Sequence, residues 1–577
     1  MDIDKRDLLT ITVISIVFFS IAAWNLGLTQ APITTWQTSQ DQSFYIDLGR
    51  TENIDTVYLL VKNGSATTQA YIGSPGNWNS QGILPLSITY PYDYYSWSKI
   101  TIESYTQYVR FHFENASVEV AELAVLDQDN QKVPIVAIVG ENESSQDLTR
   151  LIDEQGLVEC PPTYMSETFF DEIYYVKTAE NYLKLEYPYE WTHPPLGKLI
   201  IAFGIFAFGY SPFVWRIMGV IFATLMLPII YVLGKKLFGT WIGAFTSAFL
   251  LAFDFMHFTM ARMATVDTYV VFFSLASQLF FLIYIKDVFK NGWKASIVPL
   301  FLGFLFFALG FSTKWFVLYG FIGLIAFLMI LRLRDVTKLK ETWSAKLNAL
   351  LDPPFYLLPL FLLMAILIYF LTFIPDMIVG RSIVDVLGLQ GSMYIYHSTL
   401  SATHPFSSAW WSWPLILRPV WLYVSYLPLD MKSTITLLGN PAVWWPGFIS
   451  IIIVTAKAIP GRFWKKLPKL QILAKNQPSV DWIALFIVVV FFFQWVPYVF
   501  ISRITFIYHY YLNVPLLCLA SAYLVSKCWP SKWGKIATIA LLAAVVILFA
   551  LFYPIISGKP SSTTSIESLK WFESWVF

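Results

Sequence analysis

The sequence has little charge and little cysteine. Only 13% of its 577 residues are Asp, Glu, Lys or Arg, well below the share of about 25% in soluble globular proteins. A net charge of +1 leaves no basic excess that would indicate nucleic-acid binding. The three cysteines, Cys160, Cys518 and Cys528, have no CxxC spacing, which argues against a disulfide framework and against a zinc site.

Apolar runs fill much of the remaining sequence, since 56% of the residues are hydrophobic and 18% are aromatic. The first run, from about Leu8 to Leu28, is long enough to cross a bilayer. We expect it to be an uncleaved anchor, with a cleavable signal as the alternative. Further runs predict a polytopic α-helical membrane protein with about eleven transmembrane helices, each about 20 residues long. The later runs begin near residues 212, 238, 266, 296, 315, 355, 441, 480, 506 and 535.

Lysine and arginine gather in alternate breaks between these runs, as the positive-inside rule requires. The basic breaks are Lys235–Lys236, Lys286 to Lys294, Arg332 to Lys346, Lys457 to Lys475 and Lys527 to Lys535. This pattern predicts a multi-pass protein of the cell membrane whose N-terminus lies in the cytoplasm. It places residues 160–193, the loop 376–440 and the tail 557–577 outside.

Residues 31–150 differ from the rest because they are polar and alternate with a period of two. Ser43–Leu48, Thr56–Lys62 and Tyr108–Phe113 are typical of strands, and turn clusters at 62–65 and 74–77 separate them. We predict an extracytoplasmic β-sandwich inserted after the first helix. Its motifs loosely resemble discoidin-like, galactose-binding domains, and the alternative is a spacer or docking module without a sugar site. All three Asn-x-Ser sequons, at Asn63, Asn115 and Asn142, fall in this domain, which agrees with an exterior location.

Three basic residues lie in the predicted outer breaks, where topology does not need them. They are Arg262, Lys314 and Arg503. Charges at such positions often face a cavity or a substrate site. The alternative is snorkelling, or pairing with Asp254 or Asp267.

The first outer loop contains an adjacent pair of carboxylates, Asp171 and Glu172. Such a pair can hold one carboxylate as a general base toward a hydroxyl, although a solvated loop is the simpler explanation for an isolated pair. A base combined with outer cations suits displacement of a phosphate leaving group by a hydroxyl, because the cations offset the charge that develops on the phosphate.

Several motifs follow one another in the order found in one known family. They are Asp171-Glu172, His193-Pro-Pro-Leu-Gly-Lys198, Phe253-Asp254, Arg262 to Asp267, Ser312-Thr-Lys-Trp315, Ser412-Trp-Pro414, Arg418-Pro419, Gly439-Asn-Pro441 with Trp444-Trp445, and Ser502 to Tyr510. From about residue 165 to 555 the chain resembles the protein O-mannosyltransferases, which are dolichyl-phosphate-mannose–protein mannosyltransferases of the GT-C type and glycosyltransferase family 39.

The resemblance implies an enzyme that moves mannose, or a related hexose, from a polyprenyl or dolichyl phosphate to Ser or Thr hydroxyls of an acceptor protein, with inversion. It implies that Asp171 is the base and that Glu172 shapes the site. Arg262 matches the donor-phosphate arginine, and we expect Lys314 and Arg503 to contact the phosphate or lipid. Supporting roles fall to a further set of residues: His193, Asp254, Asp267, Tyr508 and His509.

The chain departs from the eukaryotic members, which carry a lumenal MIR domain, because the loop 376–440 is too short for one. The β-domain before Asp171 instead indicates a prokaryotic, archaeal-type relative. The expected organisation begins with an anchor and the β-domain and ends with a C-terminal bundle and tail. Its parts are an anchor (1–30), the β-domain (31–150), a catalytic first outer loop with interfacial helices (151–211), a GT-C core (212–375), an outer loop (376–440), a C-terminal bundle (441–556) and an extracytoplasmic tail (557–577).

Two alternative functions and the question of a metal ion stay open at this point. A related GT-C transferase could use a lipid or glycan acceptor. A transporter is the non-enzyme alternative, but paired broken helices in two related halves are not evident in the sequence. We expect no obligatory cofactor, although Asp171, Glu172 and His193 could form part of a site for Mn²⁺ or Mg²⁺.

Overall fold

The computed structural model describes residues 3–79, 86–89, 93–141, 147–459 and 480–577. The chain divides into two compact units. The helical unit comprises Met1–Trp24, Lys184–Ile200 and Met218–Phe577, and the sheet unit comprises Asn25–Leu183 and Ile201–Ile217. The predicted sequon Asn142 and most of the basic break 457–475 lie outside the described residues.

Among the described residues, eight helices are long and apolar enough to cross a membrane. They are α1 (Lys5–Ala23), α4 (Pro212–Phe238), α7 (Asp267–Asn291, continued by η3, Gly292–Lys294), α9 (Val317–Thr337), α14 (Pro441–Ala458), α16 (Trp482–Trp495, continued by η7, Val496–Phe500), α17 (Val514–Cys528, preceded by η8, Ile507–Asn513) and α18 (Lys532–Ser557). Two bent pairs raise the number to ten if each pair is one span: α5 (Trp241–Ala252) with α6 (Phe255–Ala261), and α10 (Trp343–Leu351) with α11 (Leu358–Leu371).

The eleventh predicted span corresponds to α8 (Val298–Phe311), which has 14 residues. At 1.5 Å per residue it is about 21 Å long, shorter than the hydrocarbon core of about 30 Å. The polytopic helical fold is therefore confirmed. The remaining predicted span, α8, is apolar but too short to cross the hydrocarbon core by itself. The segment predicted to lie along the membrane interface contains α3 (Leu196–Phe208), an apolar helix of 13 residues, and its depth in the membrane stays a prediction.

The bend between α5 and α6 has a clear cause at Asp254. This residue caps α6 by accepting a hydrogen bond from His257 N at 3.1 Å. Its other carboxylate oxygen accepts from Asn440 N at 3.2 Å and from Trp444 Nε1 at 2.8 Å. Asp254 is fully buried, so these three donors satisfy a carboxylate that has no access to water. The predicted supporting residue Asp254 thus joins the α5–α6 break to the start of α14.

Basic residues collect at one end of the helical unit. Lys235 at the end of α4 pairs with Asp7 in the first turn of α1 at 2.8 Å. Arg334 near the end of α9 lies 4.7 Å from the ring of Trp482 at the start of α16. Tyr523 near the end of α17 donates to Asp481 at 2.6 Å. These contacts place the basic breaks of the described chain at a single end, as the charge pattern predicted.

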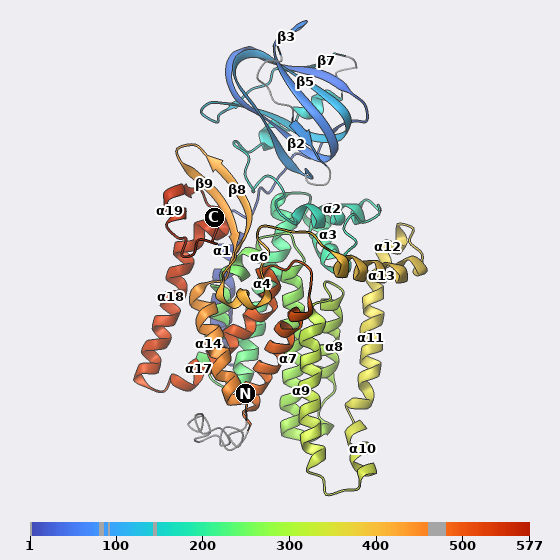
Figure 1. The fold of residues 1–577 in the computed structure, drawn as a ribbon, viewed down its shortest axis with the longest axis vertical. Coiled ribbons are helices and arrows are strands. Elements are labelled where there is room, and N and C mark those ends of the chain that lie inside the picture. The colour runs from blue at the N-terminus through green and yellow to red at the C-terminus, as the bar shows by residue number, and fades with distance from the viewer. Residues whose placement is uncertain (1–2, 80–85, 90–92, 142–146, 460–479) are drawn as a thin grey trace. The chain divides into compact units, whose positions relative to one another are not determined.

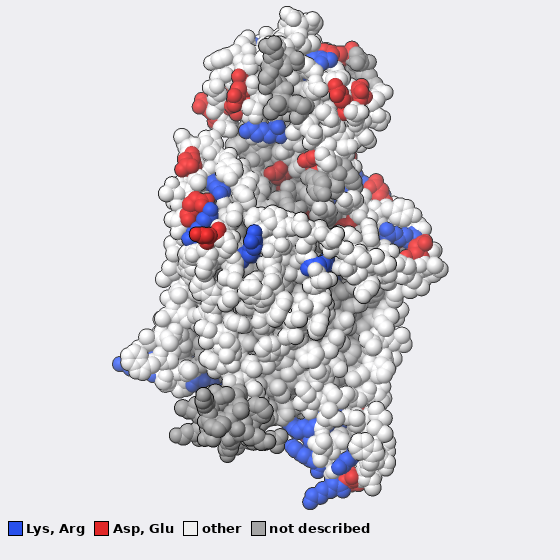
Figure 2. Space-filling model, in the orientation of Figure 1, with Lys and Arg blue, Asp and Glu red and all other residues white. Residues whose placement is uncertain are grey.

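The other end of the helical unit carries its short surface elements (Figure 1). They are α12 (Ile374–Ile378), α13 (Ile383–Thr399), the hairpin of β8 (Val420–Leu427) and β9 (Met431–Leu437), β10 (Ser561–Ser562) and α19 (Thr563–Glu567). Figure 2 shows a nearly uncharged surface along the middle of the helices, with blue side chains gathered at their lower end. This distribution is typical of a bilayer-spanning bundle.

The sheet unit contains a seven-stranded antiparallel sheet in the described residues. Its strands are β1 (Trp36–Thr38), β2 (Gln42–Ser74), β3 (Asn77–Asn79), β4 (Leu86–Ile88), β5 (Ser96–Asp127), β6 (Lys132–Val133) and β7 (Ala137–Gly140). Two long strands, β2 and β5, pair repeatedly through register shifts and enclose a core that includes Trp36, Phe44 and Phe111. The predicted β-domain is present, built from one bending sheet.

The expected turn at residues 62–65 is wrong, because β2 continues through it. Its register against β5 shifts between Val61 and Asn63, and Gly64 adopts a φ of +94°. A bulge that needs a glycine therefore resembles a turn in the sequence. The sequon residue Asn63 lies in this bulge, whereas Asn115 lies exposed with a φ of +49°.

Gly64 should be intolerant of substitution, because a Cβ there would lie 2.0 Å from the carbonyl oxygen of Ser117. We expect Gly64→Ala to lower the melting temperature of the detergent-solubilised protein. The control is Gly76→Ala, whose Cβ would meet nothing within 4 Å. That variant has only the strain of a positive φ, about 1–2 kcal/mol. Equal melting temperatures for the two variants would contradict this packing.

Candidate active site

The predicted base lies at a tight turn in the sheet unit. Phe170 has a φ of +51°, and Asp171 follows it directly before α2 (Glu172–Leu183). The carbonyl of Asp171 accepts from Tyr174 N at 3.1 Å, so the residue belongs to the first turn of α2. Its side chain is partly exposed. The predicted base therefore lies at the N-terminus of a helix, where the helix dipole favours negative charge.

Glu172 has a different environment from Asp171. Its two oxygens accept from Arg216 Nε at 2.8 Å and from Arg216 Nη2 at 2.7 Å, and both side chains are fully buried. Arg216 also donates to the carbonyls of Leu26, Tyr164 and Glu167. These contacts make Glu172 the anchor of the Asp171 turn, while a direct part in chemistry stays a prediction. Our sequence reasoning missed Arg216, although an arginine in an apolar helix signals a buried partner.

His193 belongs to a compact cluster of polar side chains in the helical unit, formed with Glu190 and Lys198. Glu190 Oε1 lies 3.1 Å from His193 Nδ1, and Glu190 Oε2 accepts from Lys198 Nζ at 2.7 Å. Lys198 Nζ also donates to the carbonyls of Glu190 and His193, each at 2.7 Å. Burial alone would raise the pKa of Glu190, but Lys198 and His193 outweigh it and hold that pKa below its usual range. The contacts give the predicted supporting residue His193 a place in the architecture of this loop, which is centred on Glu190, a residue that the sequence analysis missed.

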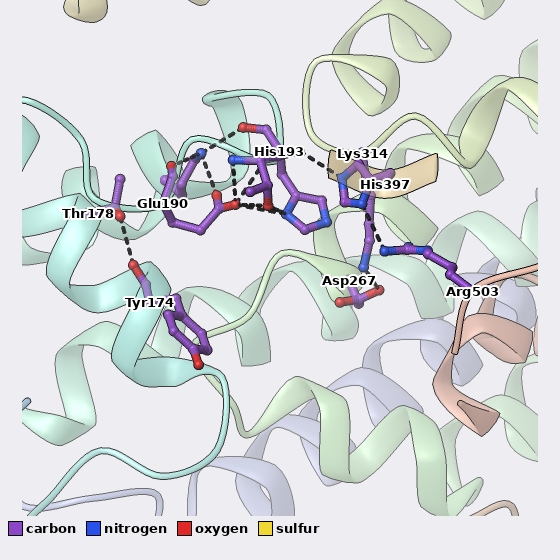
Figure 3. A network of polar contacts seen from close by, with 10 residues as sticks. Tyr174, Thr178, Glu190, His193, Asp267, Lys314, His397 and Arg503 are labelled. Atoms are coloured by element: carbon purple, nitrogen blue, oxygen red, sulfur yellow. Dashed lines mark hydrogen bonds and ion pairs between the residues drawn. The ribbon is translucent and has the colours of Figure 1, made fainter. Parts of the chain in front are cut away.

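A cavity of about 350 Å³ opens in the helical unit beside this polar cluster. Lys314, Arg503, His193 and His397 supply its polar groups, and Figure 3 shows these side chains lying near one another. Aromatic residues supply much of the remaining lining: Trp315, Phe316, Tyr319, Tyr394 and Phe500. Two cations beside an apolar wall are chemically suited to an anionic group attached to a hydrocarbon.

Lys314 and Asp267 confirm one of the pairings that the sequence left open. Lys314 Nζ lies 2.9 Å from Asp267 Oδ1, and Asp267 is the first residue of α7. The two residues also line a small adjoining pocket with Tyr508 and His509. There the His509 ring lies against Trp413, and its Nδ1 is 3.1 Å from Phe506 N. The structure therefore groups four predicted residues: Asp267, Lys314, Tyr508 and His509.

Arg503 is held by a residue that our sequence reasoning did not identify. Arg503 Nη1 lies 2.8 Å from His397 Nδ1 on α13, and His397 Nε2 lies 2.8 Å from the carbonyl oxygen of Thr192. Because a carbonyl only accepts, Nε2 carries the proton and Nδ1 accepts from Arg503. Burial, with the nearby cations, lowers the pKa of His397 to about 3. His397 is therefore a neutral link between Arg503 and the 189–198 loop.

Arg262 is occupied elsewhere in the helical unit. Its Nη1 donates to the carbonyls of Ala22 and Trp24, each at 2.7 Å, and its Nη2 donates to that of Ser557 at 3.3 Å. These carbonyls lie at the ends of α1 and α18, so Arg262 ties two helix C-termini together, where a cation is favourable. The predicted contact between Arg262 and the donor phosphate gains no support from this arrangement.

One cluster in the described residues has metal-ligand spacing: Glu122, Asp153 and Glu154 of the sheet unit. It does not include Asp171, Glu172 or His193, for which the sequence left a Mn²⁺ or Mg²⁺ site open. Both Glu172 oxygens are engaged by Arg216. Arg216 thus occupies the Glu172 oxygens that a divalent ion would need, and the metal requirement stays a prediction.

Comparison with known proteins places these features in a family. A model described as dolichyl-phosphate-mannose-protein mannosyltransferase matches residues 192–351, and one for the C-terminal four-helix membrane region of protein O-mannosyltransferases matches residues 382–575. A polyprenol-phosphate-mannose–protein mannosyltransferase of Mycolicibacterium smegmatis is 24% identical over 72% of this chain and 89% of its own. One from Corynebacterium glutamicum is 25% identical over 66% of this chain and 81% of its own.

Among solved structures, the Saccharomyces cerevisiae Pmt1–Pmt2 protein O-mannosyltransferase complex bound to its sugar donor matches with a TM-score of 0.59. It is 13% identical, over 71% of this chain and 89% of that chain, which shows a common fold. The two family matches, together with the apolar helices and this common fold, define a polytopic membrane glycosyltransferase of the GT-C class. Within that class, the chain belongs to the protein O-mannosyltransferase family.

The partly buried histidines His193 and His397 predict a contribution to acid sensitivity. The pKa values of His193 and His397 are lowered in the folded protein, first by burial, from an ordinary value of 6.5. Below pH 6.5 the unfolded chain therefore takes up protons that the folded chain refuses, and stability falls. We therefore compare the wild-type protein with His397→Gln, and expect the melting temperature of the wild type relative to that of the variant to be lower at pH 5.0 than at pH 7.5. An unchanged difference would contradict a neutral His397.

Proposed function

We propose that the protein transfers mannose, or a related hexose, from a polyprenyl or dolichyl phosphate to Ser or Thr hydroxyls of proteins on the extracytoplasmic side. The observation that carries this proposal is the cavity in which Lys314 and Arg503 lie beside aromatic walls. The relatives named above are mannosyltransferases that use polyprenol-phosphate-mannose and act on proteins, which supports the choice of donor and acceptor.

The donor side of the reaction falls to Lys314 and Arg503. A lipid phosphate carries negative charge, and more develops when the bond to the sugar breaks. Arg503 offers a planar fork of donors for phosphate oxygens, and Lys314 offers a compact ammonium group. Both are oriented before substrate arrives, by His397 and Asp267 respectively. The aromatic walls suit the first apolar units of the lipid.

The acceptor side falls to Asp171. Its carboxylate takes the proton from the Ser or Thr hydroxyl as that oxygen bonds to the anomeric carbon. The bond between that carbon and the phosphate oxygen breaks at the same time, and the electron pair leaves with the lipid phosphate. Attack on the face opposite the phosphate inverts the anomeric centre. Because two cations already balance the leaving phosphate, we propose that the reaction needs no metal ion.

The distribution of basic residues indicates the side of the membrane on which the cavity opens. Basic residues gather at one end of the helical unit, where Arg334 lies near the end of α9, whereas Lys314 lies just before the start of the same helix and therefore at the opposite end. Since basic loops stay in the cytoplasm, the cavity opens on the exterior. A transferase with a lipid or glycan acceptor remains the second candidate, because the cavity contacts the donor and leaves the acceptor undefined.

The proposal is tested by transfer of labelled mannose from a synthetic polyprenyl-phosphate-mannose to a Ser/Thr-rich peptide. We expect Asp171→Asn to lower kcat by about 10²–10⁴-fold, the usual contribution of a general base, with little change in donor binding. The control is Asp129→Asn, an exposed carboxylate of the sheet unit. Normal turnover in Asp171→Asn would refute the base, and label only in a lipid or glycan acceptor would favour the second candidate.

The phosphate contacts are tested by Lys314→Met. Loss of one donor to a developing oxyanion typically costs about 10²–10³-fold, so we expect kcat/KM for the lipid donor to fall by that order. Lys338→Met, at an exposed position just after α9, serves as the control. A fall of less than about twofold in Lys314→Met would remove Lys314 from the phosphate site.

A further inference from the structure

The β-domain forms hydrogen bonds with the segment directly before Asp171. Thr168 N donates to the carbonyl of Tyr95 at 2.9 Å, and Thr168 Oγ1 donates to that of Tyr94 at 2.7 Å. One residue earlier, Glu167 accepts from Trp97 N at 2.9 Å. Trp97 lies at the start of β5, so these bonds attach the approach to the Asp171 turn to the sheet.

The β-domain also grips the helix that follows Asp171. Glu180 on α2 pairs with Lys62 of β2 at 3.1 Å and accepts a short hydrogen bond from the Tyr94 hydroxyl. One helical turn earlier, Lys177 Nζ donates to the Asn63 side-chain oxygen at 2.8 Å. The register shift between Val61 and Asn63 in β2 lies beside the two residues that reach α2.

These contacts are shielded from water. Lys62 is 6% exposed, Lys177 is 8% exposed and Tyr94 is 1% exposed. The Lys62 ammonium lies 3.7 Å from the centre of the Tyr210 ring, in cation–π geometry. Removing one partner of a buried pair leaves the other charge unsatisfied, so such contacts are much harder to break than surface ion pairs.

Asp171 thus lies between two attachments, three residues after Thr168 and nine before Glu180. We propose that the β-domain is a positioning part of the active site: Lys62, Tyr94 and Glu180 hold the turn that presents Asp171. The inference rests on the proposed role of Asp171 as the base. In this role the β-domain needs no sugar ligand. Turnover then depends on Lys62 and Tyr94, which lie outside the segments matched by the two family models.

Two variants weaken the grip to different degrees. Tyr94→Phe removes one hydroxyl, and Lys62→Met removes the charge while keeping the length of the side chain. Lys62→Arg restores the charge and serves as the conservative rescue. Lys99→Met is the matched control, because Lys99 lies exposed on β5 of the same domain.

The full-length protein is assayed for donor KM and kcat, and the backbone amides are followed by hydrogen exchange. A misplaced catalytic group typically costs about 10²-fold. We expect Lys62→Met to lower kcat by about that factor and Tyr94→Phe to lower it by less, with donor KM within about twofold. Amides of residues 168–175 should exchange faster, while the core of β5 (109–126) should keep its protection. Lys62→Arg should recover most of the turnover.

Unchanged kcat with faster exchange at residues 168–175 would overturn the inference. So would loss of protection throughout β5 in both Tyr94→Phe and Lys62→Met, which would make these contacts purely structural. Failure of the proposed function is recognised separately, because the wild-type protein would then transfer no mannose to peptide. In that case the attachment itself would still be visible in the exchange of residues 168–175.

Discussion

A carboxylate and a guanidinium without access to water, those of Glu172 and Arg216, fix the first outer loop. Each charge would be costly to bury alone, so neither can leave without the other. Arg216 also holds three loop carbonyls, which spares them the cost of unpaired burial. The residue next to this pair is Asp171. The pair anchors the turn, and the β-domain contacts on either side orient it, so a partly exposed carboxylate is held by buried contacts on both sides.

The cavity of the helical unit follows the same principle with different residues. Lys314 and Arg503 are charged groups beside apolar helices, and each is oriented by one neutral or acidic partner. Neither pairing uses all the donors of its cation. Arg262 has the same charge and lies at the same end of the helices, but several backbone carbonyls take its donors. The difference between structural and substrate-facing cations therefore lies in what surrounds them, which the positive-inside pattern cannot reveal.

Much of the fold could be predicted from the sequence because hydropathy and loop charge respond directly to the bilayer. The apolar helices and the basic end follow from these two patterns, whereas the β-domain follows from the period-two alternation of a polar segment. The bulge at Gly64 was mistaken for a turn, since both favour the same residues. Arg216 and His397 were missed because their roles depend on partners that lie 44 and 106 residues away in sequence. Spacing within a motif carries no information about such contacts.

The central claim is that Lys314 and Arg503 bind the lipid phosphate. A structure of the protein with bound polyprenyl phosphate tests it most directly. The account predicts phosphate oxygens within hydrogen-bond distance, about 3 Å, of Lys314 Nζ and the Arg503 guanidinium, with the lipid beside Trp315 and Tyr319. A phosphate bound at Arg262 instead, with Lys314 and Arg503 still paired as described, would contradict it.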